Sequence, residues 1–312
     1  HAMRDTPARI NMNTYFDRAE MRAVTERSTA WGVFMIVHCW AVIAAAMALV
    51  AWLPNPLTIL LAIAIIGTRQ LGLAILVHEG AHGGLATNEK LNLWLSQWLC
   101  AYPTFSETLA YRRYHMKHHR LTQMREDPDL SLSAPFPTTR ASIRRKVIRD
   151  LTGQTGFKQR RAQFMAALGT PDMAFADRVR LFGAKLGRAF AVNIAMAVGL
   201  ALLGYWWLYP LLWIVPLLTW HMLVTRIRNI AEHAMVHDAD PWRIARTTRA
   251  NWLGRAFIAP YYVNYHAEHH IMLYVPCYRL PLMHRLLDAK GLKPKLETLP
   301  GYAAVLRMAA PA

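Results

Sequence analysis

The amino-acid sequence predicts an all-α integral membrane protein, with four transmembrane helices in two hairpins and a helical cap on one side of the bilayer. Two long stretches of its 312 residues, 28–68 and 189–225, contain no Lys, Arg, Asp or Glu. The chain is 54% hydrophobic and 18% charged, whereas a typical soluble domain is about 25% charged. Its formal net charge of +17 would suit a nucleic-acid-binding protein, but such a protein does not need so much apolar sequence. The composition excludes a disordered chain and argues against an ordinary soluble enzyme.

The first uncharged stretch is long enough for two helices that cross the bilayer. A Pro-Asn-Pro turn sequence at residues 54–56 divides it. At 1.5 Å per residue, each part exceeds the roughly 30 Å hydrocarbon core. We therefore expect spans at about residues 29–53 and 56–77. The polar segment before them, residues 1–28, does not resemble a cleavable signal peptide, and we expect it to lie in the cytosol.

The second uncharged stretch also divides into two spans. It holds 37 residues, about 55 Å as one helix, which is too long for a single crossing. Residues 204–210, Gly-Tyr-Trp-Trp-Leu-Tyr-Pro, combine helix breakers with aromatic residues typical of membrane interfaces. We expect spans at about residues 189–203 and 211–225, with an insertion at residues 78–188 before them and the C-terminal part of the cap at residues 226–312 after them.

The charges also predict the orientation of the chain. The turn of each hairpin is uncharged, so all 36 Lys and Arg residues lie on one side of the membrane or, like Arg69, within a span. By the positive-inside rule, that side is the cytoplasm. We therefore expect both termini and the cap on the cytosolic face of the cytoplasmic (inner) membrane, and we interpret the net charge as a consequence of topology.

Two segments of the insertion are expected at the membrane surface. Residues 91–103 are apolar but too short to cross the bilayer, which indicates a re-entrant or interfacial helix. Its Trp94 and Trp98 would share one face, which core packing explains equally well. Residues 140–188 contain 12 basic and 3 acidic residues. We expect them to lie against anionic head groups, with docking of an acidic protein as the alternative.

Histidine is clustered in four places. The sequence reads His-x-x-x-His at residues 78–82, His-x-x-His-His at both 115–119 and 266–270, and Asn-x-x-x-His at 229–233. With 14 histidines in 312 residues, about 0.03 copies of His-x-x-His-His are expected by chance. On a helix, positions i, i+3 and i+4 share one face, so each motif offers two or three imidazoles to one place. The spacing therefore predicts metal binding.

The predicted topology brings the four clusters to one site. The second and fourth spans end at the cytosolic face beside His78 and His233, and both His-x-x-His-His motifs lie in cytosolic segments. Nine imidazoles fit two metals with four or five ligands each, and Asn229 could hold a water. The sequence does not divide the nine between the metals. The candidate ligands are His78, His82, His115, His118, His119, His233, His266, His269 and His270.

The three boxes HEGAH, HMKHH and HAEHH, with Asn-x-x-x-His before the last, resemble those of the membrane fatty-acid desaturase superfamily. The flanking sequences agree, including Tyr-Arg-Arg-Tyr at residues 111–114 and Val-Pro-Cys-Tyr-Arg-Leu-Pro at residues 275–281. The resemblance runs from about Ala30 to His284. It implies a cytosolic cap in which the nine histidines bind two non-haem iron ions and Asn229 acts through a water.

The resemblance also implies a reaction. Two irons with histidine ligands activate O2 and remove hydrogen from an unactivated C–H bond. We expect an O2-dependent desaturase that introduces a double bond into a fatty acyl chain of a membrane lipid or acyl thioester. A hydroxylase or ketolase acting on acyl chains or carotenoids is the alternative, because these enzymes and desaturases share the removal of the first hydrogen atom. A histidine-rich metal transporter is a more distant alternative. Its metal site would lie at mid-membrane, whereas these motifs lie at or beyond the cytosolic ends of the spans. Purified protein could hold zinc in place of iron.

The expected partners follow from what the sequence lacks. It contains no flavin, haem or iron–sulfur motif, and its isolated Cys39, Cys100 and Cys277 form no metal-binding pattern. The electrons must therefore come from an external donor, which we expect to be a ferredoxin or a small b-type cytochrome with its reductase. A membrane lipid is the expected substrate, and no nucleic-acid partner is expected.

Other polar residues are expected in supporting roles. Arg69, a charge within a span, is expected to line the substrate entrance or to pair within the bundle. His237 is expected to support the ligands at most, His284 to be structural, and His38 and His221 to be packed or hydrogen-bonded. Five carboxylates are expected to orient the ligating imidazoles: Glu79, Asp127, Asp129, Glu232 and Glu268.

Overall fold

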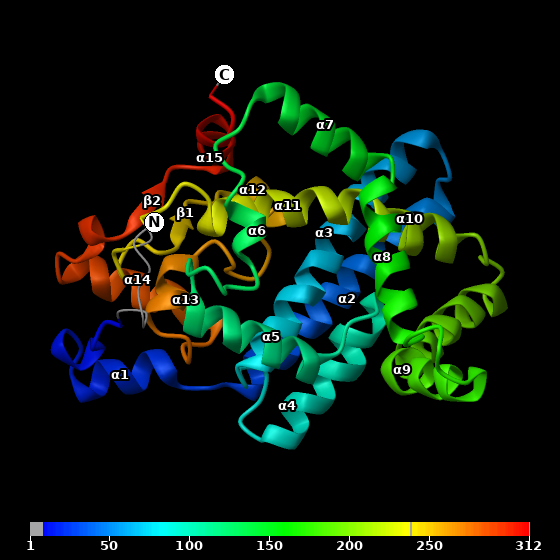
Figure 1. Cartoon of the computed structure of the whole chain (residues 1–312), viewed down its shortest axis with the longest axis horizontal. Coiled ribbons are helices and arrows are strands. Elements are labelled where there is room, and N and C mark those ends of the chain that lie inside the picture. Colours follow the sequence, from blue (N-terminus) through cyan, green and yellow to red (C-terminus); the bar gives the residue numbers. More distant parts are fainter. Residues whose placement is uncertain (1–8, 238, 312) are drawn as a thin grey trace.

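The computed structural model describes residues 9–237 and 239–311 and is mostly helical (Figure 1). Four helical segments among these residues are long and apolar enough to cross a membrane. They contain α2 (Thr29–Trp52), α3 (Pro56–Ala81), α9 (Phe175–Leu202) and the segment Pro210–His233. The short helix α1 (Arg18–Thr25) precedes α2. The predicted class of an apolar, helical membrane protein is supported, while the arrangement of four spans in two hairpins stays a prediction.

The helices extend beyond the predicted spans. The third begins at Phe175 rather than at residue 189, and α3 continues to Ala81, so that His78 lies in its last turn. A helix does not stop at the membrane surface, because each further residue still adds a backbone hydrogen bond. Hydropathy therefore indicates which residues lie in the apolar part of a helix, and not where the helix begins or ends.

The fourth segment is not one regular helix. A π-helical turn at Pro210–Ile214 leads into α10 (Val215–Leu218), and α11 (Trp220–His233) follows after a break at Thr219. Pro216 has no backbone N–H and therefore interrupts the hydrogen-bond ladder just before the break. From there α11 runs without interruption to His233.

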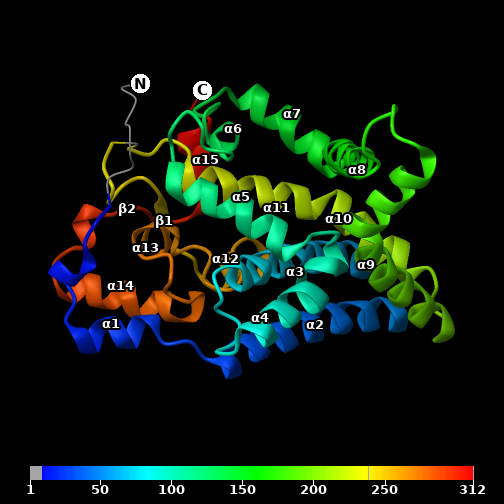
Figure 2. The ribbon, with the colours of Figure 1, turned by 60° about the horizontal axis from the view of Figure 1, so that its bottom comes forward.

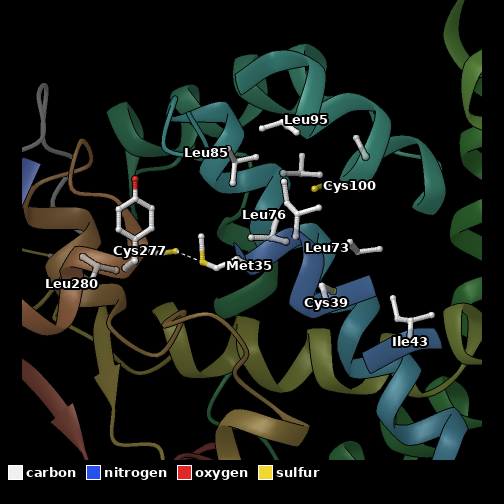
Figure 3. Close-up of a cluster of buried hydrophobic side chains, with 14 of the residues drawn as sticks. Met35, Cys39, Ile43, Leu73, Leu76, Leu85, Leu95, Cys100, Cys277 and Leu280 are labelled. Atoms are coloured by element: carbon white, nitrogen blue, oxygen red, sulfur yellow. Dashed lines mark hydrogen bonds between the residues drawn. The ribbon is translucent and has the colours of Figure 1, made fainter. Parts of the chain in front are cut away.

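Helices α2 and α3 form a hairpin, and α3 also contacts α10 and α11 (Figure 2). The side chain of Ser28 caps α2, and Asn55 and Thr58 form a capping box at the start of α3. Both begin where the sequence supplies N-cap residues. Figure 3 shows the buried cluster at their interface, to which later segments add side chains; it includes Met35, Cys39, Ile43, Leu73, Leu76, Leu95, Cys100 and Cys277.

The insertion forms five helices: α4 (Glu89–Ser96), α5 (Thr108–Leu121), α6 (Leu130–Ser133), α7 (Arg140–Leu151) and α8 (Gln154–Ala167). After α4, residues 97–101 form a π-helical turn that packs against the α2–α3 hairpin, where Nε1 of Trp40 donates to the carbonyl of Leu99 at 2.8 Å. Trp94 and Trp98 are 53% and 37% exposed. Core packing therefore does not explain these two tryptophans, whereas an interfacial position remains compatible with their exposure.

The C-terminal part of the chain is mostly helical but not entirely. It contains α12 (Trp252–Phe257), α13 (His266–Ile271), α14 (Leu280–Ala289) and α15 (Tyr302–Ala309), and it gathers at the end of the molecule opposite α9 (Figure 2). Strand β1 (Arg246–Thr248) pairs in parallel with β2 (Glu297–Leu299). The expectation of an all-α chain is wrong at these two strands, because three residues are too few to show a strand periodicity.

Candidate metal centre

The first histidine motif lies at the end of α3. His78 belongs to its last turn and His82 is its C-cap, after which Gly83 turns the chain with a φ of +76°. The backbone carbonyl of Gly80, inside the motif, accepts a hydrogen bond from Nδ2 of Asn92 at 2.9 Å, so the last turn of α3 is fixed to α4. The end of a long buried helix therefore positions both imidazoles.

The structure brings all nine candidate histidines together and divides them into two groups. Within each group, one ring nitrogen of every member lies within 4.8 Å of the others. Both His-x-x-His-His motifs contribute to both groups, so α5 and α13 connect the two. The five-histidine group is His78, His82, His115, His119 and His269, and the four-histidine group is His118, His233, His266 and His270.

In the four-histidine group, hydrogen bonds set the protonation of the rings. Nδ1 of His118 lies 2.7 Å from Oδ1 of Asp127, and Nδ1 of His233 lies 3.0 Å from the carbonyl of Ile244. Both oxygens only accept, so each Nδ1 donates, and each neutral ring is left with a lone pair on Nε2. The Nε2 atoms of His118 and His266 nevertheless lie 3.1 Å from Nε2 of His233. Lone pairs at this separation repel unless a cation lies between them.

The five-histidine group shows the same convergence. Nε2 of His119 lies 2.8 Å from Nε2 of His115 and 3.0 Å from Nε2 of His269. Nε2 of His78 and both ring nitrogens of His82 are buried without a hydrogen-bond partner among the described residues. Buried polar atoms without partners are costly and rare. The donor set of each group therefore fits a metal ion that prefers imidazole nitrogen.

Burial keeps most of these rings neutral. It lowers the pKa of His82 to about 4. His118 is the exception: burial acts to lower its pKa, but the hydrogen bond and the charge of Asp127 outweigh burial and raise it. Neutral imidazoles are the form that ligates metals. Burial first, and then repulsion from neighbouring rings, hold the pKa well below its usual value for His115, His119, His266, His269 and His270.

Three of the five predicted carboxylates lie within 4 Å of a ring nitrogen in the four-histidine group. Asp127 makes the direct contact with His118, and Oδ2 of Asp129 lies 3.6 Å from the same Nδ1. Oε1 of Glu232 lies 3.5 Å from Nδ1 of His266. The hydrogen bond from Asp127 turns Nε2 of His118 toward the centre of the group.

The other two carboxylates differ from expectation. Oε1 of Glu79 is 3.9 Å from Nδ1 of His78, too far for a hydrogen bond. Glu268 is fully buried and hydrogen-bonds Thr247 and His284 instead of a candidate ligand. Glu268 therefore connects α13 to β1 and α14, and His284 has the structural role that was expected of it.

The remaining histidines of the described residues lie outside both groups. The side chain of His237 is 61% exposed, and its Nε2 is 3.8 Å from Oε2 of Glu297. Nδ1 of His38 pairs with the Tyr261 hydroxyl at 2.9 Å, and His221 is buried in α11. Asn229 is half-buried one turn before His233, and its action through a water stays a prediction.

Sequence reasoning missed the carbonyl of Ile244, which orients His233. A backbone oxygen has no signature in the sequence, so no motif could have revealed it. It also missed a cavity of about 380 Å³ that is lined by His119 and His270, one member of each group. Most other lining residues are apolar or aromatic, and the polar ones are Arg9, Asn11, Asn13, Thr25 and Thr122. The cavity gives a small molecule access to both groups.

Replacing Asp127 by asparagine tests the orienting role of this carboxylate. Asparagine keeps the size but removes the charge that holds Nδ1 of His118 protonated. We expect the metal affinity of the four-histidine group to fall about 10- to 100-fold. The measurement is metal retained after dialysis against increasing chelator concentrations. Asp177→Asn, at an exposed carboxylate on α9, is the control, and equal retention by the two variants would contradict the assignment.

Comparisons of the sequence with known proteins identify a family and several relatives. Residues 51–298, which include all nine histidines, match the sequence model of the fatty acid desaturase family. The chain is 29% identical over 286 residues to the dihydrorhizobitoxine desaturase of Bradyrhizobium elkanii, covering 88% of this chain and 77% of that protein. It is 23% identical over 261 residues to the beta-carotene ketolase of Paracoccus sp. (strain PC1), covering 79% and 88%. The zeaxanthin 4-ketolase of Chlamydomonas reinhardtii is 23% identical over 232 residues, covering 72% and 43%.

Proposed function

The chain belongs to the fatty acid desaturase family, and from this premise we propose that it is an O2-dependent di-iron desaturase that introduces a double bond into a fatty acyl chain. The observation that carries the proposal is the convergence of nine buried histidines in two groups that share α5 and α13. Each group offers imidazole nitrogens to one ion, which suits a pair of metals rather than a single one.

The protein's own residues would hold and orient this pair. The five-histidine group would bind one iron, and the four-histidine group, with a water held by Asn229, would bind the other. When bound, the irons would supply the activation of O2 and the removal of hydrogen from an unactivated C–H bond. Asp127 and the carbonyl of Ile244 would keep Nε2 of His118 and His233 directed at the metal, and Glu232 would lie beside Nδ1 of His266.

The proposed reaction takes two hydrogen atoms from neighbouring carbons. One saturated acyl chain, two electrons from the donor, two protons and one O2 give one alkene and two waters. The proposed substrate is an acyl chain of a membrane lipid or an acyl thioester, which the four apolar helices and the family support. One relative is named for dihydrorhizobitoxine rather than for a fatty acid. The acyl substrate is therefore the part of the proposal that most needs a direct test.

A second candidate function is a ketolase or hydroxylase, acting on carotenoids or acyl chains. Two of the relatives are named as carotenoid ketolases. Desaturation and oxygenation share the removal of the first hydrogen and then differ in whether a second hydrogen leaves or oxygen is transferred. The histidine groups alone do not distinguish these outcomes, so the product must be measured.

The remaining partners and the location belong to the same proposal. We place the metal centre and both termini on the cytosolic side of the cytoplasmic membrane, because the basic residues lie outside the uncharged stretches. A ferredoxin or a small b-type cytochrome with its reductase would supply the electrons. The basic helices α7 and α8 are a candidate docking surface for an acidic donor.

The test is expression of the full chain with a ferredoxin and its reductase, followed by mass spectrometry of the cellular lipids. Loss of two hydrogen atoms from an acyl chain identifies desaturation. Gain of one oxygen atom identifies hydroxylation, and replacement of two hydrogens by one oxygen identifies a ketone. Cells that express only the donor proteins are the control. Unchanged lipids, with iron-loaded protein and reduced donor both present, would contradict an acyl-lipid substrate.

A further inference from the structure

A second cavity, of about 600 Å³, lies between α2, α3 and α12, and none of the nine candidate ligands lines it. Its lining is aromatic, apolar or cationic and contains no acidic residue. Trp31, Phe34 and Trp252 supply much of the apolar wall, and Arg69, Arg255 and Tyr261 supply polar groups. The comparisons with known proteins assign no role to this cavity.

Arg69 is the unusual member of this lining. It belongs to a candidate membrane span and is only 6% exposed. Its Nη2 donates to the carbonyl of Ala256 at 3.2 Å, and its Nη1 lies 3.4 Å from the hydroxyl of Tyr261. A guanidinium has five N–H donors, and no ion pair joins Arg69 to an acidic residue in the described part of the chain. A buried charge within a span normally pairs with another charge or with backbone carbonyls. Here the described residues supply one carbonyl and the hydroxyl and ring of Tyr261, but no carboxylate.

Several residues that line the cavity are also exposed, and they are of the types found in the head-group region of a bilayer. Phe34 on α2 and Trp252 on α12 are 59% and 71% exposed, although both are large and apolar. Arg255 is also exposed on α12. Tryptophan and arginine on a short surface helix are typical of the head-group region. The end of α12 is fixed to α3, because Thr68 Oγ1 donates to the carbonyl of Phe257 at 3.0 Å.

We propose that this cavity binds an anionic phospholipid of the adjoining leaflet. Its phosphate would pair with Arg69 and Arg255, and one acyl chain would lie against Trp31 and Phe34. Arginine suits this role because its planar guanidinium binds phosphate through two parallel hydrogen bonds and stays charged. The positive lining without acidic residues selects an anionic head group over a zwitterionic one.

The cavity lies close to the metal centre but is separated from it. Met35 lines the cavity, and its Sδ lies 3.7 Å from Sγ of Cys277 in the buried cluster (Figure 3). The next residue, Tyr278, donates its hydroxyl hydrogen to the carbonyl of Gly84, two residues after His82, at 2.8 Å. A lipid bound here would therefore be held beside the centre, and its binding does not depend on the metals or on the reaction.

The test is lipid binding to the purified full chain by native mass spectrometry. The probes are phosphatidylglycerol and phosphatidylcholine with identical acyl chains, added to delipidated protein in a neutral detergent. We expect one phosphatidylglycerol to be retained in preference to phosphatidylcholine. Arg255→Gln, at an exposed position, is expected to weaken this binding about tenfold through loss of a charge-assisted hydrogen bond. Arg69→Gln is expected to weaken it further, and Arg69→Lys to retain part of it.

Arg180→Gln is the matched control, because the side chain of Arg180 on α9 is 82% exposed and lies outside the cavity. It is expected to bind phosphatidylglycerol like the unchanged protein. Equal retention of the two lipids, or equal binding by the Arg255 and Arg180 variants, would overturn the proposal. Retention of palmitate in place of phosphatidylglycerol would also overturn the proposal, because the cavity would then bind a free fatty acid rather than a phospholipid.

Discussion

Replacement of His118 by alanine is expected to halve the bound iron and to abolish product formation. His118 belongs to the four-histidine group, and its loss leaves three imidazoles and an Asp127 carboxylate without its histidine partner in a buried site. Iron content should fall from about two to about one per chain, because the five-histidine group keeps its ligands. Product formation should fall by about 100-fold or more, since a change of an orienting group alone costs 10- to 100-fold in metal sites. Metal analysis and lipid mass spectrometry on the same preparation measure both effects.

His237→Ala is the matched control for this prediction. His237 follows His233 by four residues, but its side chain is 61% exposed and lies outside both groups. Its replacement should leave iron content and product unchanged. Two irons and normal product in the His118 variant would contradict the di-iron centre. Loss of both irons would contradict the independence of the two groups.

The site residues were accessible from sequence because their spacing is local. Residues at i, i+3 and i+4 of a helix share a face whatever the helix packs against. The two His-x-x-His-His motifs were therefore readable as sets of converging imidazoles, and the uncharged stretches placed them near one another. The sequence does not predict which histidines share a group. That division depends on how α5 and α13 are placed relative to the ends of α3 and α11.

The parts that the sequence did not predict depend on contacts between distant segments. The carbonyl of Ile244 orients His233 only because the chain after α11 returns to it. The strands β1 and β2 pair through three residues each, although 48 residues lie between Thr248, where β1 ends, and Glu297, where β2 begins. The expected orienting role of Glu268 is wrong because Thr247 and His284 occupy its two oxygens. Spacing along one helix contains no information about such partners.

Replacement of Gly32 by alanine is expected to destabilise the protein strongly. A Cβ atom at Gly32 would lie 1.9 Å from the backbone carbonyl oxygen of Leu85, so α2 and the loop after the first histidine motif approach too closely for any side chain. The loop cannot easily retreat. The N–H of Leu85 donates to Asn92 at 3.0 Å, and the N–H of Thr87 donates to Thr29 at 3.0 Å.

Helix α2 would therefore have to shift, separating the side chains packed around Met35 and displacing the loop that follows His82. Overpacking of this kind costs about 3 kcal/mol or more where neither side can yield, which thermal unfolding in detergent would register as a lower melting temperature. Gly183→Ala on α9 is the control, because nothing lies within 4 Å of its Cβ position. There the same substitution should leave stability unchanged or raise it by up to about 1 kcal/mol through better helix propensity. Equal melting temperatures of the two variants would show that the loop can move, and that the close approach at Gly32 does not hold the first histidine motif in place.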